Sequence, residues 1–164
     1  MGFKDLVVSS GGGNYLKTPP GATKVRIVSG AVKFWKDFDG KKQYLTEEAA
    51  KINPNVKIRY SMWVIDREDG VLKVWECSAP IVRDIVALAN NPEYAFEDLP
   101  PYDIIINRVG TTQNDTRYTL TPARQNTALT EIEVEEIKKL KKIEMFLRED
   151  AEDSGEIKLE DIPF

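Results

Sequence analysis

The sequence predicts an all-β fold, a five-stranded β-barrel with helical additions. Three observations support this prediction. Apolar and polar residues alternate over several segments of strand length, and turns rich in glycine and aspartate separate these segments. A helical spacing replaces the alternation at one place inside this set, before the last two strands. The chain has 164 residues, which is enough for one sizeable core.

The first three strands are expected in the first half of the chain. The first covers residues 23–35 and is interrupted at Ser29-Gly30, because glycine inside a strand marks a bulge or a bend. Residues 57–66 and 71–77 are the second and third strands, and Glu68-Asp69-Gly70 closes them into a hairpin. The segment between the first two strands is expected to be a turn followed by a polar loop.

A helix and two more strands follow. Residues 80–89 have the apolar spacing of a helix, with Ser78 as a candidate N-cap and Pro80 in the first turn. Residues 102–109 and 116–122 alternate again and are joined by a turn. Three strands, a helix and two strands, with a bend in the first strand, match the five-stranded OB barrel. In that fold a helix between the third and fourth strands closes the bottom of the barrel, whereas an SH3-like barrel lacks a helix of this length there.

A second helix is expected after the last strand. Thr130 and Glu133 form a capping box at its start. One side of the helix carries an apolar stripe made of Ile132, Ile137, Leu140, Ile143 and Leu147. We expect this stripe to pack across the barrel, and the alternative is that it pairs two protomers.

These elements divide the chain into four parts, and composition predicts disorder for the last of them. They are an N-terminal arm (1–22), the barrel (23–125), a C-terminal helix (126–149) and an acidic tail (150–164).

Composition argues against catalysis. The chain has no histidine and one cysteine, Cys77. It therefore lacks the commonest general base, the Ser–His and Cys–His nucleophile pairs, and any Cys/His zinc site. We expect no enzymatic activity, no metal and no cofactor. We also expect a cytoplasmic protein that contacts no membrane, because the sequence has neither a signal-peptide pattern nor a long apolar run.

The charge is distributed unevenly along the chain. The net charge is -4, but residues 149–164 contain seven acidic residues and one lysine and so carry -6. Residues 1–148 therefore carry +2. A mildly basic body with an acidic tail suits a protein that binds a polyanion without doing so indiscriminately.

The alternation in the strands predicts which side chains would contact a nucleic acid. In residues 57–66, Lys57, Arg59 and Trp63 lie on one face, opposite a core face that begins with Ile58. Cations and an indole ring in a row suit a single strand, since cations bind phosphates while aromatic rings stack on bases. The alternative is that Trp63 packs under a loop.

Other strands add further candidates. Lys33 and Trp35 are expected to face the same groove as Lys57 and Arg59, and whether Trp35 and Trp75 are core or DNA-facing stays open. The candidate contacts are Lys33, Trp35, Lys57, Arg59, Trp63, Lys73, Trp75, Asn107, Arg108 and Arg117.

The last residues of the chain form a candidate partner-binding site. An acidic run leads into Asp161-Ile162-Pro163-Phe164. A terminal Phe164 offers a ring and a carboxylate to an apolar pocket and one cation. This ending resembles the acidic tip of bacterial single-stranded DNA-binding proteins, which implies recruitment of replication and repair enzymes through Asp161, Ile162, Pro163 and Phe164.

A second resemblance covers roughly residues 12–125. Short motifs in a shared order resemble the bacteriophage single-stranded DNA-binding proteins with an OB fold; they are Tyr15–Gly21, Lys24–Ile27, Val74–Glu76, Asn91–Tyr94, Tyr102–Ile104 and Asp115–Pro122. The resemblance implies a non-catalytic protein that coats single-stranded DNA in phage replication, recombination and repair, acts in the host cytoplasm, and recruits a polymerase, helicase, primase or nuclease. Some relatives carry a zinc module that this chain cannot build.

We expect a monomer that binds single-stranded DNA without sequence preference. Two alternatives remain open at this point. One is an OB-fold factor that binds RNA or tRNA, which a comparison of DNA and RNA affinity would distinguish. The other is a protein-interaction module, which would show no salt-sensitive binding of oligonucleotides.

Overall fold

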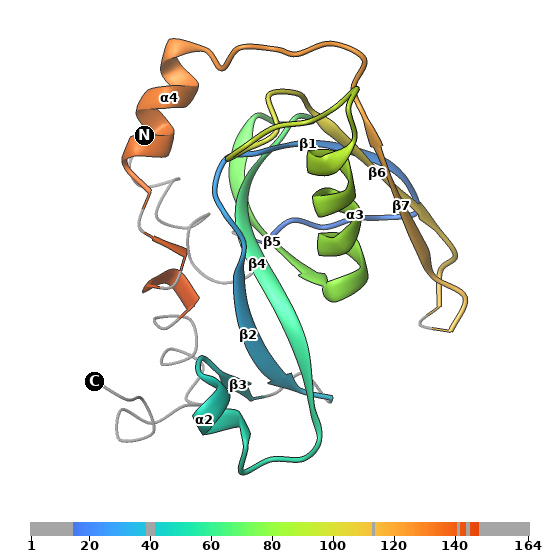
Figure 1. The fold of residues 1–164 in the computed structure, drawn as a ribbon, viewed down its shortest axis with the longest axis vertical. Helices are drawn as coiled ribbons and strands as arrows, with labels where there is room; N and C mark the ends of the chain where they lie inside the picture. The colour runs from blue at the N-terminus through green and yellow to red at the C-terminus, as the bar shows by residue number, and fades with distance from the viewer. Residues whose placement is uncertain (1–14, 39–41, 113, 141, 144, 148–164) are drawn as a thin grey trace.

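The computed structural model describes residues 15–38, 42–112, 114–140, 142–143 and 145–147 (Figure 1). These residues form a mainly β structure, a seven-strand antiparallel sheet with a few short helices, and so confirm the predicted class. The strands are β1 (Gly21–Ile27), β2 (Val32–Asp37), β3 (Gln43–Tyr44), β4 (Val56–Asp66), β5 (Val71–Ser78), β6 (Ile104–Val109) and β7 (Arg117–Pro122). The helices are α2 (Glu47–Ala50), α3 (Ala79–Asn90) and α4 (Glu131–Lys138).

The strands follow the order β3-β2-β4-β1-β6-β7, and β5 pairs with β4. The predicted first strand is divided into β1 and β2 at the expected place, and both parts pair with β4. Ile27 is opposite Val64, and Val32 is opposite Ser61. The four residues 28–31 between β1 and β2 therefore lie opposite only two residues of β4, Met62 and Trp63. The Ser29 hydroxyl accepts a hydrogen bond from the Trp63 amide at 2.8 Å and thereby satisfies a β4 donor at the break.

The hairpin of β4 and β5 and the helix α3 form as predicted. Asp66 is opposite Val71, and Gly70 closes the turn with a φ of 73°, a conformation that glycine adopts without strain. Ser78 is the N-cap of α3, although its side chain makes no capping hydrogen bond, and Pro80 lies in the first turn. Ile81 of α3 is buried against the sheet.

Two hydrophobic clusters lie on opposite faces of the sheet. The inner cluster contains Val25, Ile27, Met62, Val64, Trp75, Cys77, Ile81, Tyr102, Ile104 and Ile106. The outer cluster contains Val28, Phe34, Trp63, Ile65, Val74, Ile143 and Leu147. Strands β4 and β5 contribute to both clusters, so their central residues are buried on both faces.

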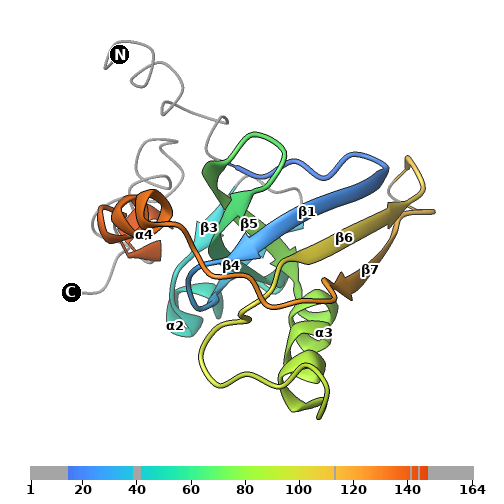
Figure 2. The same ribbon diagram turned by 90° about the horizontal axis from the view of Figure 1, so that it is seen from above.

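The helix α3 lies beside the inner cluster. It packs against β4, β5 and β7 (Figures 1 and 2). Among the described residues β5 and β7 do not pair with each other. The structure thus shows a curved sheet whose two ends are bridged by a helix, and closure into a barrel stays a prediction.

The helix α4 begins with the predicted capping box. The Thr130 hydroxyl accepts from the Glu133 amide at 3.1 Å, and Glu133 accepts from the Thr130 amide at 2.9 Å. The hydrogen bond from the Thr130 amide contributes most to lowering the pKa of Glu133. Arg67 lowers this pKa further, and partial burial of the carboxylate opposes both effects.

The predicted apolar stripe of this helix is wrong at Ile132, which is 76% exposed. The rest of the stripe packs on the outer cluster, and the helix ends earlier than expected.

The structure adds two short elements that the sequence did not predict. They are the strand β3 and the helix α2. Thr46 is the N-cap of α2, and its hydroxyl accepts a hydrogen bond from the Ala49 amide at 3.1 Å.

Two of the predicted parts lie wholly or mostly outside the described residues. They are the tail 150–164 with its Asp161–Phe164 tip and most of the N-terminal arm. In the described part of the chain no helix is long and apolar enough to cross a membrane.

The thiol of Cys77 is expected to be unreactive in the folded protein. Burial raises its pKa from 9.0 to about 12, so near pH 8 its thiolate fraction is about a thousandfold lower than in the unfolded chain. A thiol-specific reagent at pH 8 should label Cys77 in denaturant and not in native buffer. Because the folded state holds this proton more tightly, the thiol also makes stability fall as the pH rises from about 9 to 12. Equal labelling rates with and without denaturant would contradict this burial.

Candidate nucleic-acid interface

The register of β2 against β4 determines which candidate residues share a face. Lys33 is opposite Tyr60, Trp35 is opposite Ile58, and Lys36 is opposite Lys57. Residues directly opposite each other in an antiparallel pair project from the same face. One face of this hairpin therefore carries Lys33, Trp35, Ile58 and Tyr60, which we call the aromatic face. The other carries Lys36, Lys57 and Arg59, which we call the cationic face.

The prediction that Lys33 and Trp35 share a face with Lys57 and Arg59 is wrong. The alternation within each strand was identified correctly, but the register between strands cannot be obtained from it. A shift of one residue moves every side chain of a strand to the opposite face. The four residues thus belong to one hairpin but to its two sides.

The aromatic face has a cation beside an indole ring. Trp35 is half-buried, and the Lys33 ammonium lies 5.4 Å from the centroid of its ring. The ring quadrupole attracts an ammonium at this distance. Ile58, expected in the core, is 41% exposed because the hairpin continues past α3 toward β3 and α2 (Figure 1). This face offers an aromatic plane, an apolar neighbour and a positive charge together.

The cationic face has more positive than negative charge. Glu76 on β5 is shared by two cations, with Lys36 Nζ at 3.2 Å and Arg59 Nε at 3.1 Å from its two carboxylate oxygens. In the part of the chain that the structure describes, the side chain of Lys57 makes no hydrogen bond or ion pair, whereas its backbone pairs with Lys36. One carboxylate among three cations leaves a charge of +2 that can attract phosphates.

Trp63 lies on the strand face that was predicted for it, but that face is covered at this position, so the expectation that its ring is open to DNA is wrong. It is 7% exposed and belongs to the outer cluster. The Phe146 ring meets it edge to face, with centroids 5.2 Å apart. Its strand neighbours Ser61 and Ile65 are buried as well. The segment that contains Phe146 covers this side of β4, which agrees with the alternative that Trp63 packs beneath another part of the chain.

The β5 candidates also have structural roles. Trp75 is 3% exposed in the inner cluster, so the question that the sequence left open is answered as core. The Lys73 ammonium donates to Asp66 at 2.9 Å and to Asp69 at 2.8 Å. Partial burial opposes the charge of Lys73, but these hydrogen bonds raise its pKa. Two carboxylates already neutralise this lysine.

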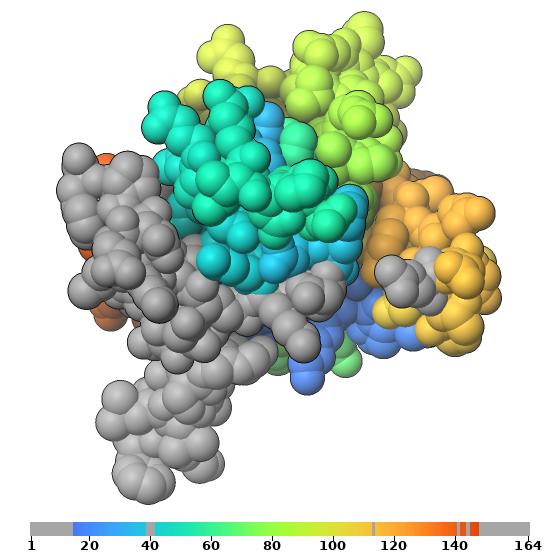
Figure 3. Space-filling model, turned by 90° about the horizontal axis from the view of Figure 1, so that it is seen from below, coloured from blue at the N-terminus to red at the C-terminus, as the bar shows by residue number. Residues whose placement is uncertain are grey.

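The remaining candidates lie on the hairpin of β6 and β7. Asn107 donates to the Thr121 hydroxyl at 3.0 Å, Arg108 donates to the Thr18 carbonyl at 2.9 Å, and the exposed Arg117 donates to the Thr116 carbonyl at 3.0 Å. Strands β4 and β1 separate this hairpin from β2 in the sheet. Figure 3 looks onto the end of the molecule with α2, and the β6–β7 hairpin lies to one side of it.

The structure therefore places Lys33 and Trp35 on one face of the β2–β4 pair and Lys57 and Arg59 on the other, and it leaves the remaining candidates elsewhere. It adds Lys36 and Tyr60, which the sequence analysis missed. The signal for Lys36 was present, because it follows Val32 and Phe34 in the same alternation. Tyr60 alternates with Ile58 on the face that was expected to be core, and it is half-buried at the edge of the inner cluster.

Among the residues that the structure describes, no three His, Cys, Asp or Glu side chains gather in a way that could hold a metal ion. Comparison with protein-family models, with curated proteins and with solved structures finds no match for this chain. The function must be inferred from the residues themselves.

Proposed function

We propose that this protein is an OB-fold single-stranded DNA-binding protein that coats and protects the strand without sequence preference and without catalysis. One observation carries the proposal. The β2–β4 hairpin has Trp35 beneath the Lys33 ammonium on its aromatic face and Lys36, Lys57 and Arg59 on its cationic face. Base stacking and phosphate contacts of this kind are available to every base, so they bind single strands with little regard to sequence.

The strand pairing supports an OB fold. When β1 and β2 are counted as one bent strand, the pairs β1–β4, β4–β5, β1–β6 and β6–β7 are all antiparallel. The helix α3 follows the third strand of this set and packs between β5 and β7. A helix in this position closes the bottom of an OB barrel.

We extend the proposal to the context that the sequence motifs imply. The protein would act as a monomer in phage replication, recombination and repair, in the cytoplasm of the host. Its Asp161–Phe164 tip would recruit a polymerase, helicase, primase or nuclease. The resemblance of the motifs and of the tip to known single-stranded DNA-binding proteins supports this part.

Binding of oligo-dT is expected to weaken with salt. The logarithm of the affinity should fall linearly with the logarithm of salt concentration, by about 0.7 per phosphate neutralised. Lys57→Ala should reduce this slope by about 0.7, because the Lys57 side chain has no internal partner among the described residues to retain it. The titration can follow tryptophan fluorescence at several salt concentrations.

Lys139→Ala is the matched control, since Lys139 is an exposed cation just after α4. It should leave the slope unchanged. Duplex DNA should bind far more weakly, because its bases cannot stack on Trp35. Tighter binding of an RNA oligonucleotide would favour an RNA-binding factor instead. Salt-independent binding, or no oligonucleotide binding, would leave a protein-interaction module.

A further inference from the structure

A groove lies between α3 and the loop that joins this helix to β6 (Figure 2). Its volume is about 250 Å³, and we call it the α3 groove. It is lined mainly by apolar side chains, which include Met62 of β4, Val82 and Val86 of α3, and Leu99 of the loop. Val86 is 51% exposed and Leu99 is 38% exposed. Large apolar side chains of this groove therefore remain in contact with solvent.

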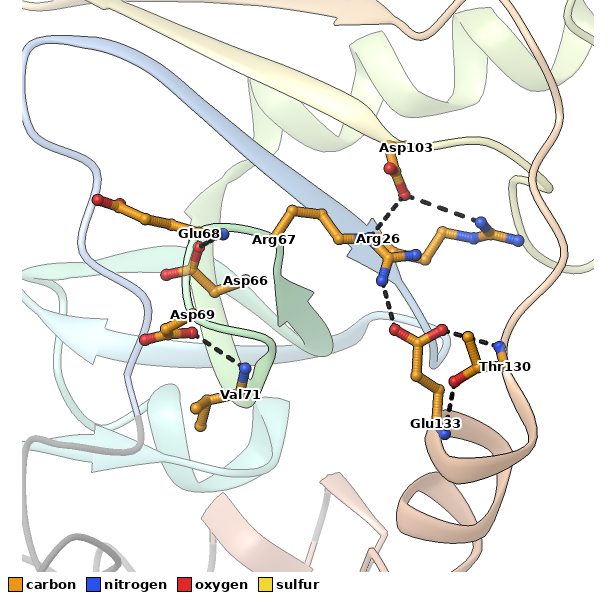
Figure 4. A network of polar contacts seen from close by, with 9 residues as sticks. All are labelled: Arg26, Asp66, Arg67, Glu68, Asp69, Val71, Asp103, Thr130 and Glu133. Carbon is orange, nitrogen blue, oxygen red and sulfur yellow. Dashed lines mark hydrogen bonds and ion pairs between the residues drawn. The ribbon is translucent and has the colours of Figure 1, made fainter.

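The loop side of the groove is anchored to the rest of the fold. The Tyr102 hydroxyl donates to the Tyr94 carbonyl at 2.8 Å, and the rings of Tyr94 and Phe96 both meet the Tyr102 ring edge to face. Asp103 follows directly, and Figure 4 shows its contacts, which include the ion pair with Arg67 at 3.1 Å. A partner that enters the groove therefore does not have to order the loop first, which favours binding.

The surface around the groove is acidic. Residues 83–98, which cover most of α3 and the first part of the loop, contain one arginine and four acidic residues and so carry -3. Two of these carboxylates, Glu97 and Asp98, line the groove and are exposed. Their side chains make no hydrogen bond or ion pair with any residue that the structure describes. Negative charge at this place repels the phosphates of a nucleic acid and attracts cationic side chains.

The shape and chemistry of the groove fit a helix. Val82 and Ala89, which both line it, are about 10 Å apart along the axis of α3, or two helical turns. An amphipathic helix binds in an apolar groove by inserting residues at positions i, i+3, i+4 and i+7, which cover the same length. Lysine or arginine beside this apolar stripe would lie next to Glu97 and Asp98.

We propose that the α3 groove is a docking site for an amphipathic helix of another protein, whose apolar stripe is flanked by lysine or arginine. This inference goes beyond the proposed function, because it requires neither a nucleic acid nor the Asp161–Phe164 tip. Met62 of the groove lies on the inner face of β4, opposite Lys57 and Arg59 in the alternation of the strand. A docked helix therefore leaves the cationic face free.

Binding of two designed peptides to the full chain tests the proposal. Both peptides are about 15 residues long, which is enough for a helix, and both carry the same stripe of leucines. The remaining positions are lysine in one peptide and glutamate in the other. Fluorescence anisotropy of the labelled peptides should show at least about tenfold tighter binding of the lysine peptide, because only this peptide complements Glu97 and Asp98. Equal affinities, or no binding of the lysine peptide, would overturn the proposal.

Two substitutions on α3 distinguish the groove from the acidic tail, which also attracts a basic peptide. Val86→Lys places a positive charge in the groove and removes an apolar contact, so it should weaken binding of the lysine peptide about tenfold. Ala87→Lys adds the same charge to the same helix at an exposed position outside the lining of the groove and should leave the affinity unchanged. Circular dichroism should show that both variants are folded, since both positions are exposed. Equal affinities of the two variants would assign the peptide to the tail and overturn the proposal.

A third variant tests the two carboxylates. Glu97→Gln combined with Asp98→Asn removes their charge with little change in size and should weaken binding of the lysine peptide about tenfold at low salt. The difference should decrease as salt screens the attraction. An unchanged affinity would contradict the choice of a basic partner. Self-association of the chain without peptide, abolished by Val86→Lys, would assign the groove to a second copy and overturn docking of another protein.

Discussion

Trp63→Ala is expected to lower the free energy of unfolding by about 3–5 kcal/mol, the usual cost of removing a large aromatic side chain from a core. Trp63 is buried in the outer cluster, and Phe146 rests against its ring. The cavity would separate the C-terminal segment from β4. Denaturant titration followed by circular dichroism should show the loss, and the melting temperature should fall by roughly 10 °C.

The matched control for this experiment is Ile132→Ala, which removes an exposed side chain and should change stability by less than about 0.5 kcal/mol. Where the Trp63→Ala variant remains folded, its affinity for oligo-dT should equal that of the parent chain. Unchanged stability with lost DNA affinity would restore Trp63 to an exposed, DNA-facing position.

Trp35→Ala is expected to have the opposite profile. Loss of one base stack should weaken binding of oligo-dT by about 1–3 kcal/mol, or roughly 5- to 150-fold. The effect on stability should be smaller than for Trp63, because Trp35 is half-buried and belongs to neither hydrophobic cluster. Fluorescence anisotropy of a labelled oligonucleotide measures the affinity directly.

Trp75→Phe serves as the control for the loss of an indole, since Trp75 lies in the inner cluster and phenylalanine keeps most of the packing. Its affinity for oligo-dT should be unchanged. If Trp35→Ala binds as tightly as the parent, the β2–β4 hairpin is not the interface and the proposed function loses its main support.

The features that the sequence predicted correctly depend on nearby residues. The β4–β5 hairpin follows from alternation and an Asp-Gly turn, and the capping box follows from Thr130 and Glu133, which are three residues apart. The break between β1 and β2 follows from a glycine inside a strand pattern. Each of these signals lies within a few residues of the structure it specifies.

The features that the sequence did not predict depend on distant residues. Trp35 and Ile58 share a face because of a register between strands 23 residues apart. Trp63 is buried because Phe146, 83 residues later, covers it. Alternation indicates that the two faces of a strand differ in polarity, but it does not indicate whether other parts of the chain cover both faces. For this reason the alternation within β2 and within β4 was predicted correctly, while the faces that the two strands share were not.

The two-sided burial of β4 and β5 has a consequence for synthesis on the ribosome. Phe34, Trp63 and Val74 leave the exit tunnel long before Ile143 and Leu147, the residues that cover them. The sheet can form its inner cluster while its outer side still presents a large apolar surface to solvent. The nascent chain is therefore most prone to chaperone binding and self-association after the inner cluster has emerged and before Ile143 and Leu147 emerge.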